Sequence, residues 1–225
     1  METLRTPEDV FKIIDRIKPG ETVLIECSTT STFPDLATLF FVRYARSRGL
    51  PVIIDDNFDA LYPIYQHLKF LGKAGELEDV AVLKTGGRME VGRVIGRVPF
   101  SGDSRVYISK YMKLTQSVLA EMENAINIVL GLESAFAFIN SIQEFYHFVI
   151  TLQNAVGNRH RRAFYIVNRD LLQYLEYNPL PEFERIATTV AEAVQVPDGS
   201  ILTFKKAADM ELLGESFRLV PEVVP

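Results

Sequence analysis

The stretch from Gly20 to Gly49 constrains the fold of this chain more than any other part of the sequence. An apolar, β-branched run at Thr22 to Ile25 is typical of a buried strand, and residues 34–47 carry apolar side chains at helical spacing. A short loop rich in hydroxyl groups lies between them. In nucleotide-binding α/β proteins, a unit of strand, loop and helix holds phosphate, because backbone N–H groups at the helix N-terminus face the anion. The stretch therefore predicts an α/β fold organised around this unit.

From Pro19 to about Leu71 the chain resembles the RecA-like ATPase core of the KaiC and RadA group. In that group a Gly-Glu-x-hydrophobic-x-x-Glu-Gly strand leads into the phosphate loop, and an apolar helix follows. The resemblance is one of pattern and covers most of the chain, which looks like the archaeal truncated KaiC-like proteins of unknown function. It implies a RecA-like α/β fold, with a mostly parallel sheet flanked by helices on both faces.

The groups that bind nucleotide in that family are replaced here. The family pattern places Cys27 and Thr32 where the loop glycines belong, Phe33 where the phosphate lysine belongs, and Pro34 where the magnesium-binding hydroxyl belongs. Without glycine the loop no longer adopts positive φ freely, and without lysine the phosphates lose their main counter-charge. In the second nucleotide motif, Gly131 stands where the magnesium-coordinating aspartate belongs. We therefore predict a chain that binds no ATP, needs no cofactor and has no catalytic residue.

Alternating strand and helix patterns predict one RecA-like domain over residues 1–225. It begins with a helix at residues 6–17, capped by Thr6, and ends in an antiparallel edge hairpin at residues 200–220. Residues 86–100 predict a hairpin or a meandering edge strand. Further strands are expected at residues 51–55, 80–84, 126–132 and 162–168, and further helices at residues 61–71, 103–123, 139–156 and 181–193.

The hydroxyl-rich loop is the first candidate binding site. Its side chains could bind an anion together with the helix-end amides, without a lysine. The alternative is a loop rebuilt for packing, with Thr32 as the N-cap and Pro34 at the start of the helix. The candidate residues are Ser28, Thr29, Thr30, Ser31 and Thr32.

Asp55 and Asp56 form the second candidate site, because they end a buried strand at the edge where open α/β sheets bind ligands. They could be an acid–base pair or part of a divalent-metal site, and Asp59 adds to the acidity. The alternative is an acidic turn in which Asp56 or Asn57 caps the next helix. Cys27 is a weaker candidate nucleophile, since no histidine lies near it in sequence.

The helix predicted at residues 139–156 is apolar nearly all round. Such a helix is either enclosed by its own domain or partly covered by another chain. The second alternative predicts a surface for a homo-oligomer or a protein partner. The candidate interface residues are Phe145, Phe148, Val149 and Leu152.

Composition limits the class of partner. The formal net charge of −5 argues against general binding to nucleic acid or to an anionic membrane. The single cysteine fits a reducing compartment, and the start of the sequence lacks a signal-peptide pattern, so we expect a cytoplasmic protein without a membrane span. The three histidines show no metal-ligand spacing, and we predict no metal site.

Three functions remain open from the sequence. The first is a non-catalytic RecA-like domain that self-associates or binds another protein. The second is a sensor that binds a small anion or nucleotide at the altered loop without hydrolysing it. The third is an enzyme of unrelated chemistry built on the pair of aspartates.

Overall fold

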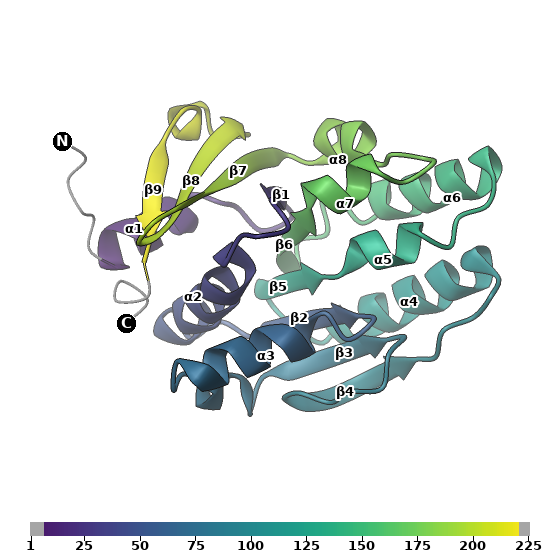
Figure 1. Ribbon diagram of the computed structural model, residues 1–225, viewed down its shortest axis with the longest axis horizontal. Coiled ribbons are helices and arrows are strands. Elements are labelled where there is room, and N and C mark those ends of the chain that lie inside the picture. Colours follow the sequence, from purple (N-terminus) through teal and green to yellow (C-terminus); the bar gives the residue numbers. More distant parts are fainter. Residues whose placement is uncertain (1–6, 221–225) are drawn as a thin grey trace.

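In a computed structural model, which describes residues 7–220, nine strands form one sheet between two layers of helices (Figure 1). The strand order is β4-β3-β2-β5-β6-β1-β7-β8-β9; the first seven strands run parallel and the last two antiparallel. This confirms the predicted α/β, RecA-like class with its antiparallel C-terminal edge. The strands are β1 Thr22–Cys27, β2 Val52–Asn57, β3 Ala81–Thr85, β4 Arg93–Val98, β5 Ala125–Leu130, β6 Arg161–Asn168, β7 Thr189–Val196, β8 Gly199–Lys206 and β9 Ser216–Leu219.

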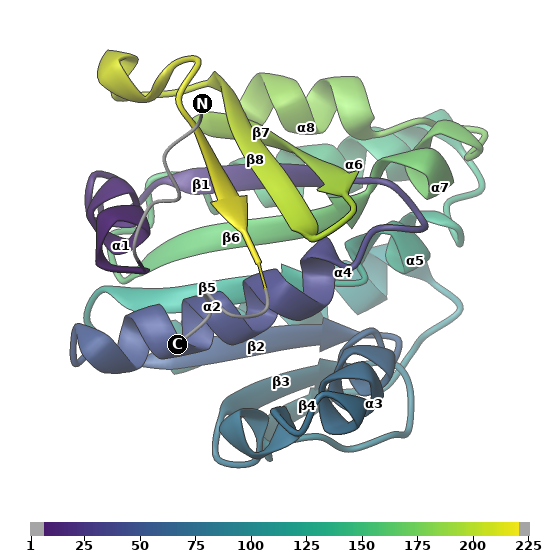
Figure 2. The ribbon, with the colours of Figure 1, turned by 60° about the vertical axis from the view of Figure 1, so that its left-hand side comes forward.

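The helices divide between the two faces of the sheet (Figures 1 and 2). One face is covered by α1 Pro7–Asp15, α2 Phe33–Ser47 and α3 Leu61–Phe70, with the short 3-10 helix Ala74–Leu77. The other is covered by α4 Ser104–Leu119, α5 Leu132–Phe136, α6 Ile142–Gln153, α7 Arg169–Gln173 and α8 Leu180–Ile186. A second 3-10 helix, Met210–Leu212, lies between β8 and β9.

The central strands are apolar on both faces because both faces are covered. Along β5 and β6, alternate side chains enter the two hydrophobic cores, as in Phe164 on one face and Tyr165 on the other. Aromatic rings fill the core under α2, where Phe41 lies 4.1 Å from Phe164 and 5.4 Å from Phe40 between ring centroids. This packing fixes α2, and with it the loop that precedes α2.

The structure decides between some of the sequence predictions and corrects others. Of the two alternatives for residues 86–100, the edge strand is observed and the hairpin is not: β4 lies at the edge of the sheet and pairs in parallel with β3. The helix expected at residues 181–193 ends at Ile186, and Thr189–Val196 is strand β7, inserted between β1 and β8. Hydrogen bonding to two neighbouring strands outweighs the local helical pattern there. Short helices α5 and α7 were not predicted.

Two further observations concern the starts of helices. Helix α1 is observed from Pro7, while its expected cap Thr6 lies outside the described residues. Asp103 caps α4, where its carboxylate accepts hydrogen bonds from the backbone N–H groups of Arg105 and Val106. Among residues 7–220, no helix combines the length and the apolar character needed to span a bilayer.

Candidate functional site

A cavity of about 250 Å³ opens at the carboxyl ends of β1, β5 and β6, beside the first turn of α2. Ligands of open α/β sheets bind at this edge. Three of the five predicted loop residues, Ser28, Thr29 and Ser31, line the cavity, whereas Thr32 lines a neighbouring depression. The remaining walls come from the end of β1, the first turn of α2, α3, the start of α5 and the end of β6. They include Cys27, Asp35, His67, Glu133 and Asn168.

Residues of the loop between β1 and α2 donate hydrogen bonds to side chains elsewhere in the chain. The Thr29 N–H donates to the Asp170 carboxylate at 2.9 Å, and the Thr29 hydroxyl donates to Asn168 Oδ1 at 3.2 Å. The Asp170 carboxylate therefore accepts a hydrogen bond from a backbone N–H group of the kind that binds phosphate in an ATPase. Both partners lie at the end of β6 or in α7, which the sequence analysis did not connect with the loop.

The second half of the loop is bonded in the same way. Gln195 Oε1 accepts from the backbone N–H of Thr32 at 2.9 Å and from its hydroxyl at 3.1 Å. The Phe33 N–H donates to Ser31 Oγ at 3.1 Å. Thr32 is the N-cap residue, as expected, but its side chain makes no capping bond to the helix. The backbone N–H groups of Thr32 and Phe33, at the start of α2, thus have partners within the chain.

Phe33, which the family resemblance aligns with the phosphate lysine, is 0% exposed. Its ring belongs to the hydrophobic core under α2, and Pro34 follows it in the first turn of the helix. A lysine at this position would have to reach the cavity from within an apolar core. The local sequence therefore builds a packed helix entry.

The cavity is acidic. Burial raises the pKa of Glu133 to about 7, and its Oε2 atom is shielded from solvent without a hydrogen-bond partner. Burial also raises the pKa of Asp35, although His67 Nδ1, 3.0 Å from its carboxylate, opposes the shift. Among the described residues, no lysine or arginine lines the cavity. A polyphosphate would therefore meet carboxylates without a matching cation.

Cys27 is buried at the end of β1, and its thiol donates to the carbonyl of Val167 at 3.3 Å. Burial raises the pKa of this thiol to about 12. The thiolate is the reactive form of cysteine, so this environment does not favour nucleophilic chemistry.

The carboxylates of Asp55 and Asp56 do not form a pair, because they lie on opposite faces of the sheet. Adjacent residues of a strand face opposite sides of a sheet. Asp55 accepts a hydrogen bond from the Tyr111 hydroxyl at 2.6 Å, and burial raises its pKa to about 6. Asp56 is paired with Lys84 on the other side and accepts from the Leu61 N–H at 2.9 Å, so it fastens the start of α3. These contacts do not support the predicted acid–base pair, and neither residue lines the cavity.

Comparison with known proteins identifies the family of this chain. A family model described as "Pyrococcus protein of unknown function, DUF257" matches residues 12–218. The chain belongs to this family. The solved structure of PH0250 from Pyrococcus horikoshii OT3 is 30% identical in sequence and has a TM-score of 0.76, covering 94% of this chain and 97% of that one.

Two more distant structures show the fold that this DUF257 chain shares. The uncharacterized protein PH0321 from Pyrococcus horikoshii is 16% identical, with a TM-score of 0.60 over 94% of this chain and 97% of its own. The KaiC-like protein PH0186 from Pyrococcus horikoshii OT3 is 10% identical, with a TM-score of 0.55 over 89% and 85% of the two chains. The DUF257 chain thus has a KaiC-like, RecA-type fold. No curated protein matches its sequence significantly.

The DUF257 chain also carries a buried ionic cluster that the sequence analysis missed. Lys84, at the end of β3, is fully buried and pairs with both Asp56 and Asp59. Asp59 also accepts from the backbone N–H groups of Arg88 and Met89, which fastens the turn after β3. The sequence did carry a signal for this cluster. Lys84 lies near the end of one buried strand, Asp56 lies near the end of the buried strand before it, and Asp59 follows that strand. The register that joins them, Asp56 opposite Lys84, exists only in the sheet.

Three rings from separate loops form an aromatic patch, which we define as Phe58, Phe100 and Phe138. The ring of Phe138 lies 4.4 Å from Phe100 and 5.4 Å from Phe58 between centroids. Phe100 and Phe138 are each more than two-fifths exposed. Phe58 has a φ of +54°, which is uncommon outside glycine. The patch lies at the carboxyl end of the sheet, just beyond the ends of β2 and β4.

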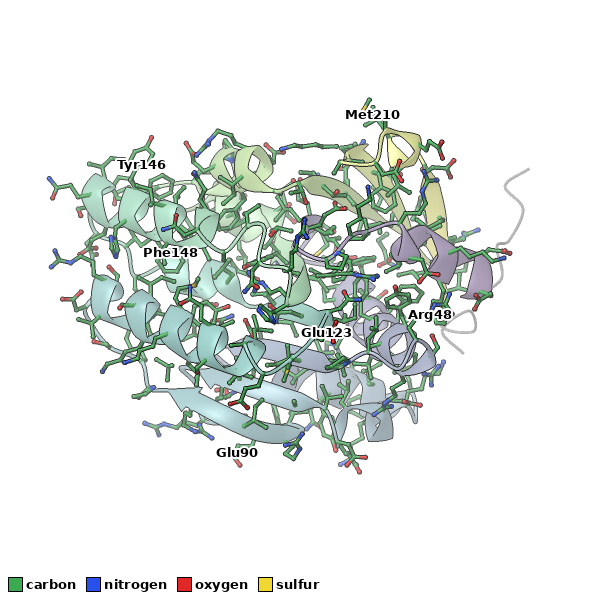
Figure 3. All side chains as sticks on the ribbon, turned by 180° about the vertical axis from the view of Figure 1, so that it is seen from behind. Arg48, Glu90, Glu123, Tyr146, Phe148 and Met210 are labelled. Atoms are coloured by element: carbon green, nitrogen blue, oxygen red, sulfur yellow. The ribbon has the colours of Figure 1, made fainter. Side chains whose placement is uncertain are left out.

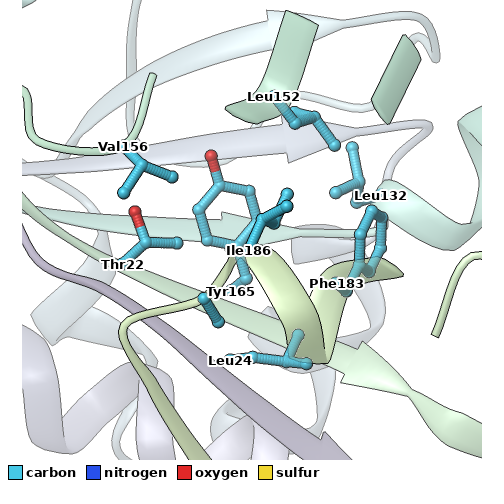
Figure 4. Close-up of a pocket in the computed structure, with 9 residues that line it drawn as sticks. Thr22, Leu24, Leu132, Leu152, Val156, Tyr165, Phe183 and Ile186 are labelled. Atoms are coloured by element: carbon cyan, nitrogen blue, oxygen red, sulfur yellow. The ribbon is translucent and has the colours of Figure 1, made fainter. Parts of the chain in front are cut away.

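The predicted interface on α6 is wrong in its choice of side chains. Phe145, Phe148, Val149 and Leu152 are all buried in the core of their own domain, and Leu152 lines a small apolar cavity together with Phe183 of α8 (Figure 4). The helix is nevertheless apolar on its other side. An outer stripe of Ile142, Tyr146 and Ile150 is about half exposed; Figure 3 shows Tyr146 at the outer edge of the molecule.

Proposed function

We propose that this chain is a RecA-like domain that does not hydrolyse ATP and acts by binding protein, either a partner or a second copy of itself. One observation carries the first half of the proposal: in the loop that the resemblance assigns to phosphate, the backbone N–H groups of Thr29, Thr32 and Phe33 donate to Asp170, Gln195 and Ser31. The burial of Phe33 and the acidic lining of the cavity also argue against ATP hydrolysis.

Exposed apolar surface supports the second half. The aromatic patch and the outer stripe of α6 place several large apolar side chains in water, where they are typical of contact surfaces. The structurally similar PH0321 was crystallised in complex with an unknown peptide, which is consistent with a peptide-binding role for this fold.

Sensing of a small anion at the loop is the competing function. The hydroxyl groups of Ser28, Thr29 and Ser31 do line the cavity. The carboxylates of Asp35 and Glu133 share that cavity, however, and the amides of Thr29 and Thr32 are already bonded. No contact among the described residues favours an anion over a neutral or cationic group there.

A thermal-unfolding screen with ATP, ADP and GTP, each with Mg²⁺, separates these functions. We expect no change in Tm with any nucleotide. A ligand present at one hundred times its Kd would add about 2.7 kcal/mol of stability, which such a screen detects readily. A magnesium-dependent rise in Tm, or phosphate release by the unaltered chain, would refute the non-catalytic half of the proposal.

Mass measurement in solution tests the binding half. Phe138→Glu places a charge in the aromatic patch and Ile150→Glu places one on the outer stripe, while Glu78→Gln serves as an exposed control outside both surfaces. We expect one of the two glutamate variants to lose a complex that the control retains. Self-association or peptide capture that neither variant affects would remove both surfaces from the proposal.

A further inference from the structure

The edge of the sheet at β4 carries a charge opposite to that of the whole chain. Strand β4 is the outermost strand of the parallel part of the sheet, and α4 follows it (Figure 1). Residues 86–118, which include β4 and most of α4, contain six basic and two acidic residues, whereas the whole chain contains 24 basic and 29 acidic residues. This edge is therefore a positive region on an acidic protein. The six basic residues are all exposed: Arg88, Arg93, Arg97, Arg105, Lys110 and Lys113.

The aromatic patch lies at the carboxyl end of this positive edge. The Phe58 N–H donates to Thr85 O at 2.9 Å, which joins the turn after β2 to the end of β3. The Gly86 N–H donates to Val98 O at 2.9 Å, which joins the turn after β3 to the end of β4. Phe100 follows Val98 by two residues. These bonds hold the ends of three strands, and the rings that follow them, at one corner of the molecule.

Three arginines belong to the same corner. Arg88 lies in the turn after β3, Arg97 is the next-to-last residue of β4, and Arg105 lies in the first turn of α4. Among residues 7–220, Arg88 forms no ion pair. Arg97 pairs with Glu90, whose side chain is 63% exposed and which Figure 3 shows at the edge of the molecule. Arg105 lies 3.6 Å from Asp103, whose carboxylate also caps α4. Exposed pairs of this kind are weak, so the guanidinium groups stay available to other carboxylates.

We propose that this corner binds a short acidic peptide segment of a partner protein, in which an aromatic or aliphatic side chain lies between carboxylates. The inference rests on the proposed protein-binding function and names the chemistry of the partner. The exposed rings of Phe100 and Phe138 offer the apolar contact. The three guanidinium groups offer the paired donors that carboxylates accept. Aromatic residues and arginines together are typical of the residues that dominate binding energy at protein interfaces.

Charge argues against a second copy of the chain at this corner. A second copy would bring the same three arginines, and like charges across an interface disfavour binding. Strand β4 is also poorly suited to pairing with another edge strand, because an extra residue, Ile95, interrupts its register with β3. Bulges and charged side chains on edge strands are features that prevent pairing between edges. The partner is therefore expected to be a different, acidic segment.

The same balance of charge disfavours a nucleic acid. A phosphodiester backbone carries a charge at every nucleotide and extends beyond the few cations of this corner, where the protein surface is acidic overall. The rings also cover one another: Phe58 and Phe138 are stacked, with 5.4 Å between centroids. Bases that bind single-stranded sites need free ring faces on which to stack. A short peptide can place its charges at the arginines alone.

Fluorescence anisotropy of labelled peptides mixed with the full chain tests the inference. The probe is Glu-Glu-Phe-Glu-Glu-Leu, and the matched peptide has glutamine in place of each glutamate. We expect saturable binding of the acidic peptide and binding roughly tenfold weaker for the glutamine peptide. The affinity of the acidic peptide should fall several-fold between about 50 mM and about 300 mM NaCl, because its ion pairs are exposed. A labelled oligothymidylate of similar length should bind more weakly than the acidic peptide.

Three variants place the binding at this corner. Arg88→Glu and Phe138→Glu should each weaken binding of the acidic peptide roughly tenfold. Arg159→Glu is the matched control: it makes the same charge reversal at an exposed arginine before β6, at the opposite edge of the sheet, and should change the Kd by less than about twofold. The glutamine and salt measurements use the unaltered chain, so they decide even if a variant fails to fold.

Four results would overturn the inference: no binding of the acidic peptide, equal binding of the glutamine peptide, equal effects of Arg88→Glu and Arg159→Glu, or tighter binding of the oligonucleotide. The proposed function is tested separately. A complex that Ile150→Glu disrupts, found together with a failure at this corner, would overturn this inference and leave the protein-binding function in place.

Discussion

The two ends of the parallel strands are built in opposite ways. At the carboxyl end the backbone N–H groups of Thr29 and Thr32 have partners in the chain, the cavity lining is acidic, and Phe33 is buried. At the amino end Arg161 and Thr115 line a second cavity, and Arg161 Nε and the Thr115 hydroxyl are shielded from solvent without a hydrogen-bond partner. The two edges therefore differ in the charge of their lining and in how their buried polar groups are bonded. Position in a fold indicates where a site can be, while the balance of donors and charges determines what it can hold.

Removal of the Phe33 ring should have the largest effect on the carboxyl end. Phe33→Ala leaves a cavity in the core and should lower the free energy of unfolding by about 3–5 kcal/mol in urea denaturation. Phe70→Ala, at a ring that is 89% exposed, should change it by less than about 0.5 kcal/mol. An equal, small loss in both variants would contradict the view that this loop is built for packing.

The acidity of the carboxyl-end cavity predicts a pH effect of intermediate size. The pKa of Glu133 is raised in the folded state, from 4.5 to about 7, so the folded chain holds a proton that the unfolded chain releases. The stability that this proton provides is complete below pH 4.5 and is lost as the pH rises to 7, by up to about 3 kcal/mol.

Denaturation of Glu133→Gln at pH 5 and pH 8 measures this effect. The variant should lose less stability than the wild-type chain between the two pH values, because its side chain does not ionise. The exposed Glu78→Gln should follow the wild-type curve. Parallel pH profiles for Glu133→Gln and the wild type would show that Glu133 is solvated at this edge.

Asp170→Ala should have a smaller effect. It removes the acceptor of the Thr29 N–H and should cost about 1 kcal/mol, a typical value for one hydrogen bond at a partly exposed site. We also expect the nucleotide screen to stay flat in this variant, because Phe33 and the acidic lining remain. ATP binding gained by this single change would show that Asp170 acts as an internal substitute for phosphate.

Thr115→Val should have the smallest effect on stability, and the comparison between the two edges depends on it. Because the Thr115 hydroxyl has no partner, its loss should change the free energy of unfolding by less than about 0.5 kcal/mol or raise it slightly. Thr38→Val is the control: that hydroxyl is buried and donates to Pro34 O at 2.7 Å, so its loss should cost about 1 kcal/mol. Equal losses would indicate that Thr115 is bonded after all.

Much of the fold was predictable because the signals are local. Apolar runs mark β1, β2, β3, β5 and β6, and the spacing of apolar residues marks α2 and α3. Strand β7 was missed because Thr189–Val196 becomes a strand only when β1 and β8 lie beside it. For α6 the sequence correctly indicated apolar side chains around the helix, but the choice between Phe148 inside and Ile150 outside depends on where α4 and α8 pack.

By itself the sequence determined that residues 27–34 lack the glycines and the lysine of a phosphate loop, since that is a matter of residue identity at Cys27, Thr32 and Phe33. Only the tertiary structure decided where the loop donors go, which aspartate faces which side of the sheet, and that Arg161 and Thr115 share one cavity. The physical reason is that hydrogen bonds, burial and charge balance join residues far apart in the chain, and the partners that settle them are set by packing.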